Sequence, residues 1–145
     1  MNWLFSSLMF IMLIFNSTPD YVQSYHAAKT KKQEVEFINK YKSSSKISIL
    51  GYVVSLEMKQ AKYKFFPWKK LSIFNKGKKR LESLIKRHPD NIDLRYLRLV
   101  IQENIPSLLN YKLNIKEDKL FLSKIMKTKN TSDYLDFYIK KNTSL

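Results

Sequence analysis

The sequence predicts an all-α protein of five or six antiparallel helices, arranged as stacked helical hairpins in a solenoid-like domain. Its 145 residues include only 2 Gly and 4 Pro, fewer than an all-β protein with many tight turns would use. Apolar residues recur at three- and four-residue spacing along most of the chain, without strand-like alternation of useful length. The connections between the periodic segments are short, which favours antiparallel neighbours.

Residues 1–24 are expected to form a signal peptide. The run from Leu4 to Phe15 is apolar except for two serines. It is shorter than the ~20 residues of a transmembrane helix and matches the apolar core of a secretory signal. Ser24, with Val22 two positions before it, offers a small-residue cleavage site. We therefore expect residues 25–145 to be one exported domain, periplasmic or extracellular. The alternative is an uncleaved N-terminal membrane anchor.

Helical spacing predicts a first helix over residues 22–41 and a second over residues 46–65, with Ser43 to Ser45 offering the N-cap between them. The second helix carries two apolar stripes, so we expect it to lie between neighbouring helices. One stripe consists of Ile47, Leu50, Val54, Met58, Ala61 and Phe65, and the other of Ile49, Val53 and Leu56.

Pro67 separates the second helix from a third over residues 68–87, because proline restrains the residue before it and suits a first helical turn. The turn "HPDN" follows, in which Asp90 or Asn91 caps a fourth helix over residues 92–104. Asn114 to Glu117 matches a capping box that opens a fifth helix, ending near residue 127. Residues 130–132 form a turn before a short last helix over residues 132–140.

Both glycines of the chain fall on apolar faces within predicted helices. Gly51 lies in the second helix and Gly77 in the third. Each costs about 1 kcal/mol relative to alanine in a helix interior. Close approach of these two helices would compensate that cost.

Composition excludes several classes of chemistry. The chain has no cysteine, so it has no disulfide, thiolate metal site or cysteine nucleophile. His26 and His88 lie far apart, without the spacing of metal ligands. No glycine-rich phosphate loop, GxSxG or HExxH pattern occurs. We therefore expect a protein that is not an enzyme and holds no cofactor or metal.

The chain is strongly basic, with 27 Lys and Arg against 12 Asp and Glu, a formal net charge of +15. Eleven basic residues and one acid, Glu82, lie within residues 59–87. The candidate basic face consists of Lys69, Lys76, Lys79, Arg80, Lys86 and Arg87. Such a face suits phosphates, lipid headgroups or acidic polymers. However, the bias toward Lys, Asn and Ile is also what an AT-rich coding sequence produces.

Four aromatic residues precede this basic face, namely Tyr63, Phe65, Phe66 and Trp68. Together with the lysines they could contact lipid or nucleic acid. The simpler interpretation, which we favour, is that the lysines solvate the outer face while the aromatic rings fill the core at the helix ends.

The fourth predicted helix is apolar on two opposite sides, with a narrow polar stripe of Arg95, Arg98 and Gln102 between them. Buried guanidinium groups need carboxylate partners, so the stripe predicts either an internal polar network or an anion-binding groove. The internal network is favoured. Its candidate carboxylates are Asp118, Glu103 and Glu57, and we expect Arg98 to be the more shielded arginine.

The segment from "FNKGKKRLESLIKRHPDN" to "IKEDKLFL" resembles an uncharacterised family of small exported all-helical bacterial proteins. The resemblance covers about residues 63–122. It rests on Gly77, Pro89, Asn91, Arg95, Leu97, Arg98, Gln102, Pro106, Leu109, Tyr111, Asp118 and Lys119. Asn110 stands where that family usually has glycine, and asparagine also tolerates the left-handed conformation. The resemblance implies a helical fold and export, and no catalytic residue.

Two functions remain open from the sequence. The leading hypothesis is a non-enzymatic exported helical protein that acts as a protein-interaction or envelope-structural module, with another envelope protein as its partner. The alternative is a basic-surface binder of an anionic polymer or membrane, such as lipid headgroups, nucleic acid or an acidic glycan. No small-molecule substrate is indicated, and the oligomeric state stays open.

Overall fold

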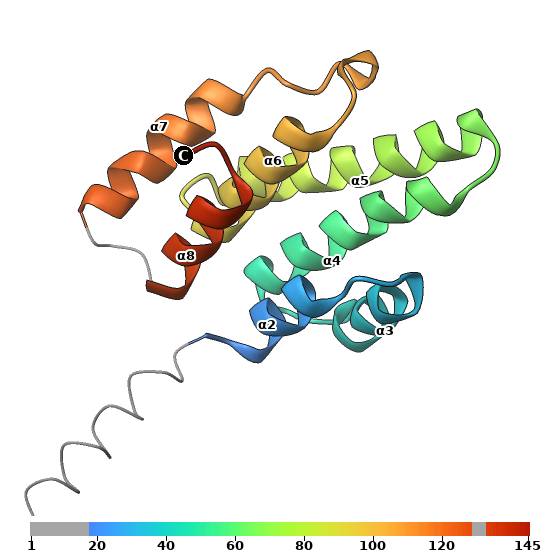
Figure 1. Cartoon of the computed structure of the whole chain (residues 1–145), viewed down its shortest axis with the longest axis horizontal. Coiled ribbons are helices and arrows are strands. Elements are labelled where there is room, and N and C mark those ends of the chain that lie inside the picture. Colours follow the sequence, from blue (N-terminus) through green and yellow to red (C-terminus); the bar gives the residue numbers. More distant parts are fainter. Residues whose placement is uncertain (1–17, 129–132) are drawn as a thin grey trace, which may run out of the picture.

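The protein is all-α in this computed structural model, which describes residues 18–128 and 133–145 (Figure 1). Seven α-helices lie within these residues: α2 (Asp20–Ala27), α3 (Lys31–Tyr41), α4 (Ile47–Lys59), α5 (Pro67–Arg87), α6 (Ile92–Asn104), α7 (Ile115–Lys127) and α8 (Asp133–Asn142). Two short 3₁₀ helices accompany them, η1 (Gln60–Tyr63) and η2 (Ser107–Leu109). Among the helices of these residues, none has the length and apolar character needed to cross a membrane. The apolar run of the expected signal peptide lies outside the described residues.

The expected count of five or six helices is wrong, because the segment predicted as one helix over residues 22–41 forms two. A capping box at Thr30 starts the second of them. The Gln33 amide donates to Thr30 Oγ1 over 3.3 Å, and Gln33 Oε1 accepts from the Thr30 amide over 3.1 Å. These reciprocal bonds hold Thr30 in an extended conformation, so the chain turns between α2 and α3.

Helix α4 lies between two hydrophobic clusters, as its two apolar stripes predict. Val53 and Leu56 of one stripe join a cluster with residues of α2, α3, α6, α7 and α8. Val54 and Met58 of the other stripe join a cluster with residues of α5 and α6. Helix α4 ends at Lys59, earlier than predicted, and η1 leads to the turn before α5. Figure 1 shows this turn projecting at one end of the molecule.

The two glycines permit close helix contacts, but with different partners. A methyl group on Gly77 of α5 would overlap Met58 Cγ of α4, so the expected approach of these helices occurs there. A methyl group on Gly51 would instead overlap a Leu94 side-chain methyl of α6. The expectation that Gly51 serves the contact with α5 is therefore wrong, because its face of α4 packs against α6.

The helix caps follow the predictions only in part. Asn91 caps α6, accepting from the Leu94 amide over 3.1 Å. The N-cap of α4 is Lys46 rather than a serine, since Ser44 Oγ accepts from the Lys46 amide before the helix begins. Asn114 precedes α7 but makes no side-chain cap. Its side-chain amide is instead hydrogen-bonded to the side chains of Gln102 and Glu117. Asn110 has φ 46°, the left-handed conformation expected at this position.

Helix α2 is part of the core, although it includes the expected cleavage site. Val22 is completely buried. Tyr25 shares a hydrogen bond with Ser55 of α4 over 2.8 Å. Cleavage after Ser24 would remove the Val22 side chain from this core. The cleavage position itself stays a prediction.

Candidate functional site

The polar stripe of α6 lies within the protein, facing α5 and α7. Arg95, Arg98 and Gln102 are all buried, and so is Asp118 of α7. The structure brings these four sequence-predicted residues together between the two apolar sides of α6. The other two candidate carboxylates pair elsewhere. Glu103 binds Lys119, and Glu57 binds Arg80.

Asp118 is the centre of this network. Arg98 donates to both of its carboxylate oxygens, with Nε to Oδ2 and Nη2 to Oδ1 each 2.7 Å apart. Arg95 Nε donates to the same Oδ1. Bidentate pairing of this kind fixes both distance and angle between a guanidinium and a carboxylate. One buried carboxylate therefore joins two arginines of α6 to the first turn of α7.

Two further carboxylates complete the network at its edges. Arg98 Nη1 donates to Glu82 of α5 over 2.9 Å, and Arg95 Nη2 donates to Glu117 of α7 over 2.8 Å. Sequence reasoning missed both. Glu82 lies one residue from the core position Leu81 of an otherwise basic helix, and its pairing depends on how α5 packs against α6, which no local spacing gives.

The electrostatics of the network favour its charged form. Burial opposes the charge of Arg98, but Asp118 and Glu82 outweigh it and raise the pKa of Arg98 above its usual value. The hydrogen bond from Asn114, aided by the two arginines, lowers the pKa of Glu117. Both shifts favour the charged forms of Arg98 and Glu117, which face partners of opposite charge.

Gln102 extends the network by bonds to Asn114. Its Nε2 donates to Asn114 Oδ1 over 3.2 Å, and its Oε1 accepts from the Asn114 amide over 3.1 Å. In the part of the chain that the structure describes, no buried side-chain nitrogen or oxygen lacks a partner. The arginines thus have internal partners, which supports a structural network over an anion-binding groove.

The candidate basic face lies on the solvent-exposed side of α5. All six of its residues are exposed. Arg80 pairs with Glu57, and Arg87 Nε donates to the Ser83 carbonyl over 3.2 Å. In the described residues, no carboxylate lies within ion-pair distance of Lys76, Lys79 or Lys86. The face is therefore a surface of largely uncompensated positive charge.

The favoured interpretation of the aromatic residues before α5 is wrong for Phe65, Phe66 and Trp68, which are all exposed. Phe65 is 88% exposed and Trp68 is 64% exposed, so neither ring fills the core. The physical reason is local. Phe66 is held extended by the following Pro67, and the chain between η1 and α5 points outward at the end of the hairpin.

This turn is held in place by a buried carboxylate that sequence reasoning missed. Glu34 of α3 is fully buried and lies 2.9 Å from Lys59 Nζ and 3.2 Å from Lys62 Nζ. Gln60 Nε2 donates to its second oxygen over 2.8 Å. Burial alone would raise the pKa of Glu34, but the two lysines lower it below its usual value. Glu34 therefore fastens η1 to α3.

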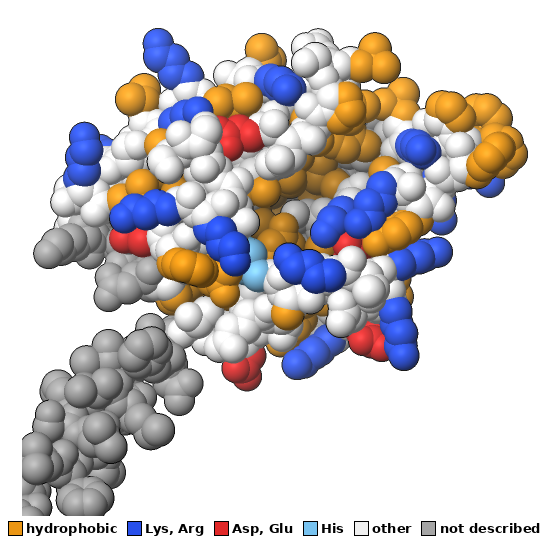
Figure 2. Space-filling model, viewed as in Figure 1, with side chains coloured by type: hydrophobic (Ala, Val, Ile, Leu, Met, Phe, Trp, Pro, Cys, Tyr) orange, Lys and Arg blue, Asp and Glu red, His pale blue; other side chains and the backbone are white. Residues whose placement is uncertain are grey.

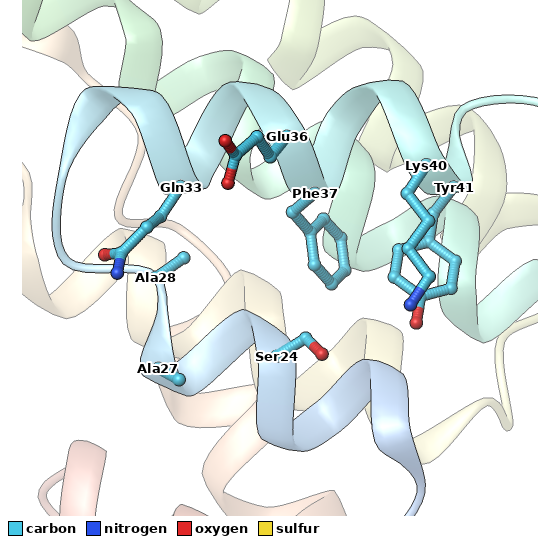
Figure 3. Close-up of a pocket in the computed structure, with 8 residues that line it drawn as sticks. All are labelled: Ser24, Ala27, Ala28, Gln33, Glu36, Phe37, Lys40 and Tyr41. Atoms are coloured by element: carbon cyan, nitrogen blue, oxygen red, sulfur yellow. The ribbon is translucent and has the colours of Figure 1, made fainter.

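A groove of about 240 Å³ lies between α2 and α3, away from the arginine network. Figure 3 shows Phe37 and Tyr41 of α3 and Ser24 of α2 facing it. Gln33 at one end is already engaged in the capping box. None of the sequence-predicted site residues lines the groove.

His26 of α2 lies half-buried at a junction of three helices. Its ring stacks on Tyr138 of α8, with centroids 3.7 Å apart. Nδ1 lies 2.8 Å from the Val22 carbonyl oxygen, and Nε2 lies 2.9 Å from the Tyr96 hydroxyl. Because a carbonyl only accepts, we assign the proton of the neutral ring to Nδ1, and Nε2 accepts from Tyr96. Burial and nearby lysines lower the pKa of His26.

We expect the free energy of unfolding to decrease as the pH is lowered through a window set by His26. A lowered folded-state pKa means that the unfolded chain binds the proton more readily, so this contribution is complete above ~6.5 and is lost as pH falls toward the folded-state pKa. The lowered carboxylates titrate below this window. Thermal melts between about pH 7.5 and 5.5 should show a drop that is absent in a His26→Gln variant. An identical drop in both proteins would contradict the assignment.

The fold and this network define a small all-α protein joined at its centre by buried arginine–carboxylate pairs. No family model, curated protein or solved structure matches the chain. The resemblance over residues 63–122 therefore stays a prediction.

Proposed function

We propose that this exported, stacked-hairpin and solenoid-like protein is not an enzyme and binds negatively charged membrane surfaces through the outer face of α5. One observation carries the proposal: most carboxylates of the described residues have partners within the protein, whereas Lys76, Lys79 and Lys86 of α5 are exposed and have no carboxylate partner. Of the two functions left open by the sequence, this geometry supports the surface binder better than the protein-interaction module.

The distribution of acids explains why the α5 face stays positive. Among the described residues, these carboxylates accept hydrogen bonds from other side chains of the protein: Glu34, Glu57, Glu82, Asp93, Glu103, Glu117 and Asp118. Glu82, the one acid of α5, turns inward to Arg98 and accepts a hydrogen bond from Tyr111. Because Glu82 pairs with Arg98, its negative charge does not neutralise the lysines on the outer face of α5.

Binding to lipid vesicles tests the proposal. Each lysine near an anionic membrane contributes about 1 kcal/mol, so a Lys76→Gln, Lys79→Gln, Lys86→Gln triple variant should bind about a hundredfold more weakly. Vesicles of phosphatidylglycerol and phosphatidylcholine, sedimented with the full chain, give the affinity. Added salt should weaken binding, since exposed charges are screened.

The control removes the same charge from another face. Lys116, Lys124 and Lys127 of α7 are also exposed, so their triple Gln variant has the same net charge. It should keep most of the affinity. Equal losses in both triple variants would show that net charge alone attracts the protein. Absence of binding to anionic vesicles at low salt would reject the proposed function.

A further inference from the structure

The turn before α5 concentrates exposed apolar side chains. Nine large apolar side chains are exposed in the described part of the chain, and four of them lie within seven residues: Phe65, Phe66, Trp68 and Leu71. We call residues 64–71 the hairpin tip. Figure 2 shows hydrophobic side chains gathered at the end of the molecule where Figure 1 places this turn. A patch of this kind marks a binding surface more often than isolated exposed residues do.

The rings of the hairpin tip form an ordered group. Phe66 stacks on Trp68 with centroids 4.6 Å apart and meets Phe65 edge-on at 5.2 Å. Glu34 fastens η1 on one side of the tip, and Pro67 starts α5 on the other. The rings are therefore held outward by the fold.

Positive charge surrounds these rings. Lys64, Lys69 and Lys70 are exposed within the hairpin tip, and Lys69 Nζ lies 5.3 Å from the centroid of the Phe66 ring. Beyond the tip, the same helix continues as the basic face. Aromatic rings beside lysines suit the boundary between lipid headgroups and acyl chains, where the rings leave water and the ammonium groups meet phosphates.

We infer that the hairpin tip inserts Phe65, Phe66 and Trp68 into an anionic phospholipid bilayer while the lysines beside them bind the headgroups. The inference rests on the proposed function and deepens it, because it makes the membrane contact partly apolar. A polymer that offers only negative charge gives the rings no apolar medium, whereas a bilayer supplies both contacts at one surface.

The fluorescence of Trp68 measures whether the hairpin tip enters the bilayer. The chain has 2 tryptophans, so a Trp3→Phe variant of the full chain leaves Trp68 as the single one. With vesicles of phosphatidylglycerol and phosphatidylcholine, the emission of Trp68 should shift to the blue, and lipids brominated on their acyl chains should quench it. Aqueous acrylamide should quench it less than in the free protein.

A matched pair of variants measures what the rings contribute. Phe65→Ser should weaken vesicle binding about tenfold, as expected for removing a phenyl ring from an apolar contact. Phe137→Ser on α8 is the control, since Phe137 is also exposed, at 59%, and has a lysine over its ring. It should bind as the parent does. Both side chains are exposed, so circular dichroism should show both variants folded.

The outcomes separate the two proposals. Salt-sensitive vesicle binding in which Trp68 stays in water, or in which Phe65→Ser binds like the parent, would overturn insertion and leave the electrostatic function in place. Loss of all vesicle binding would overturn both. A change in Trp68 emission with single-stranded oligonucleotide but not with vesicles would assign the tip to base stacking and overturn the inference.

Discussion

Replacing Asp118 with asparagine is expected to lower the free energy of unfolding by about 3–5 kcal/mol. The substitution keeps the shape of the side chain but removes the charge that Arg95 and Arg98 share. Asp118 is fully buried and Arg98 is 3% exposed, so water cannot replace the lost carboxylate. Glu82 and Glu117 keep one bond to each arginine from the edges of the site. Urea melts at fixed pH and salt measure the change.

The controls for this prediction come from the surface. Glu36 forms an exposed pair with Lys32 at 3.9 Å, and Glu36→Gln should change stability by less than about 0.5 kcal/mol. Arg98→Met should destabilise the fold more than Lys76→Met, because only Arg98 is shielded. Small and equal effects of Asp118→Asn and Glu36→Gln would show that the buried pair contributes no more than a surface pair.

The centre of the network was accessible from sequence, but its edges were not. Arg95, Arg98 and Gln102 recur at three- and four-residue spacing between apolar residues, and this period alone places them on one buried stripe. The need for a carboxylate gave Asp118 as one of three candidates, and the other two, Glu103 and Glu57, pair elsewhere. Glu117 and Glu82 depend on how α7 and α5 approach α6, and no local pattern encodes those approaches.

The exposure of the hairpin tip could not be predicted from the sequence either, because the apolar spacing around Phe65 indicates a buried residue. Phe65 continues an apolar stripe of α4 at helical spacing, so the period predicts a buried side chain. The helix ends at Lys59, however, and the seven residues before α5 no longer follow that period. The break between α2 and α3 was different, because Thr30 and Gln33 carry a capping-box signal that the helical spacing around them concealed.

Gly77 shows how a single missing side chain sets the distance between two helices. A Cβ atom at this position would overlap Met58 Cγ and lie 3.3 Å from Met58 Cβ. The sequence left open whether a methyl group would fit and stabilise the helix. The contact with Met58 shows that it fits only if that side chain moves. Gly77→Ala should therefore destabilise the protein slightly, despite a helix propensity about 1 kcal/mol better than glycine.

Gly77→Leu is expected to cost more than about 3 kcal/mol, the upper end of ordinary overpacking, because a branched side chain cannot fit without separating α4 from α5. Asn75→Leu, two residues away on the exposed side of the same helix, is the control and should change stability by less than about 0.5 kcal/mol. Truncating the Met58 side chain tests whether its overlap with position 77 causes the loss of stability. In a Met58→Ala background the methyl group of Gly77→Ala has room, so that substitution should become stabilising through helix propensity. Urea melts of the four combinations at positions 58 and 77 give the coupling energy. A coupling near zero, or a Gly77→Leu protein as stable as the parent, would show that the two helices do not meet through Met58 in solution.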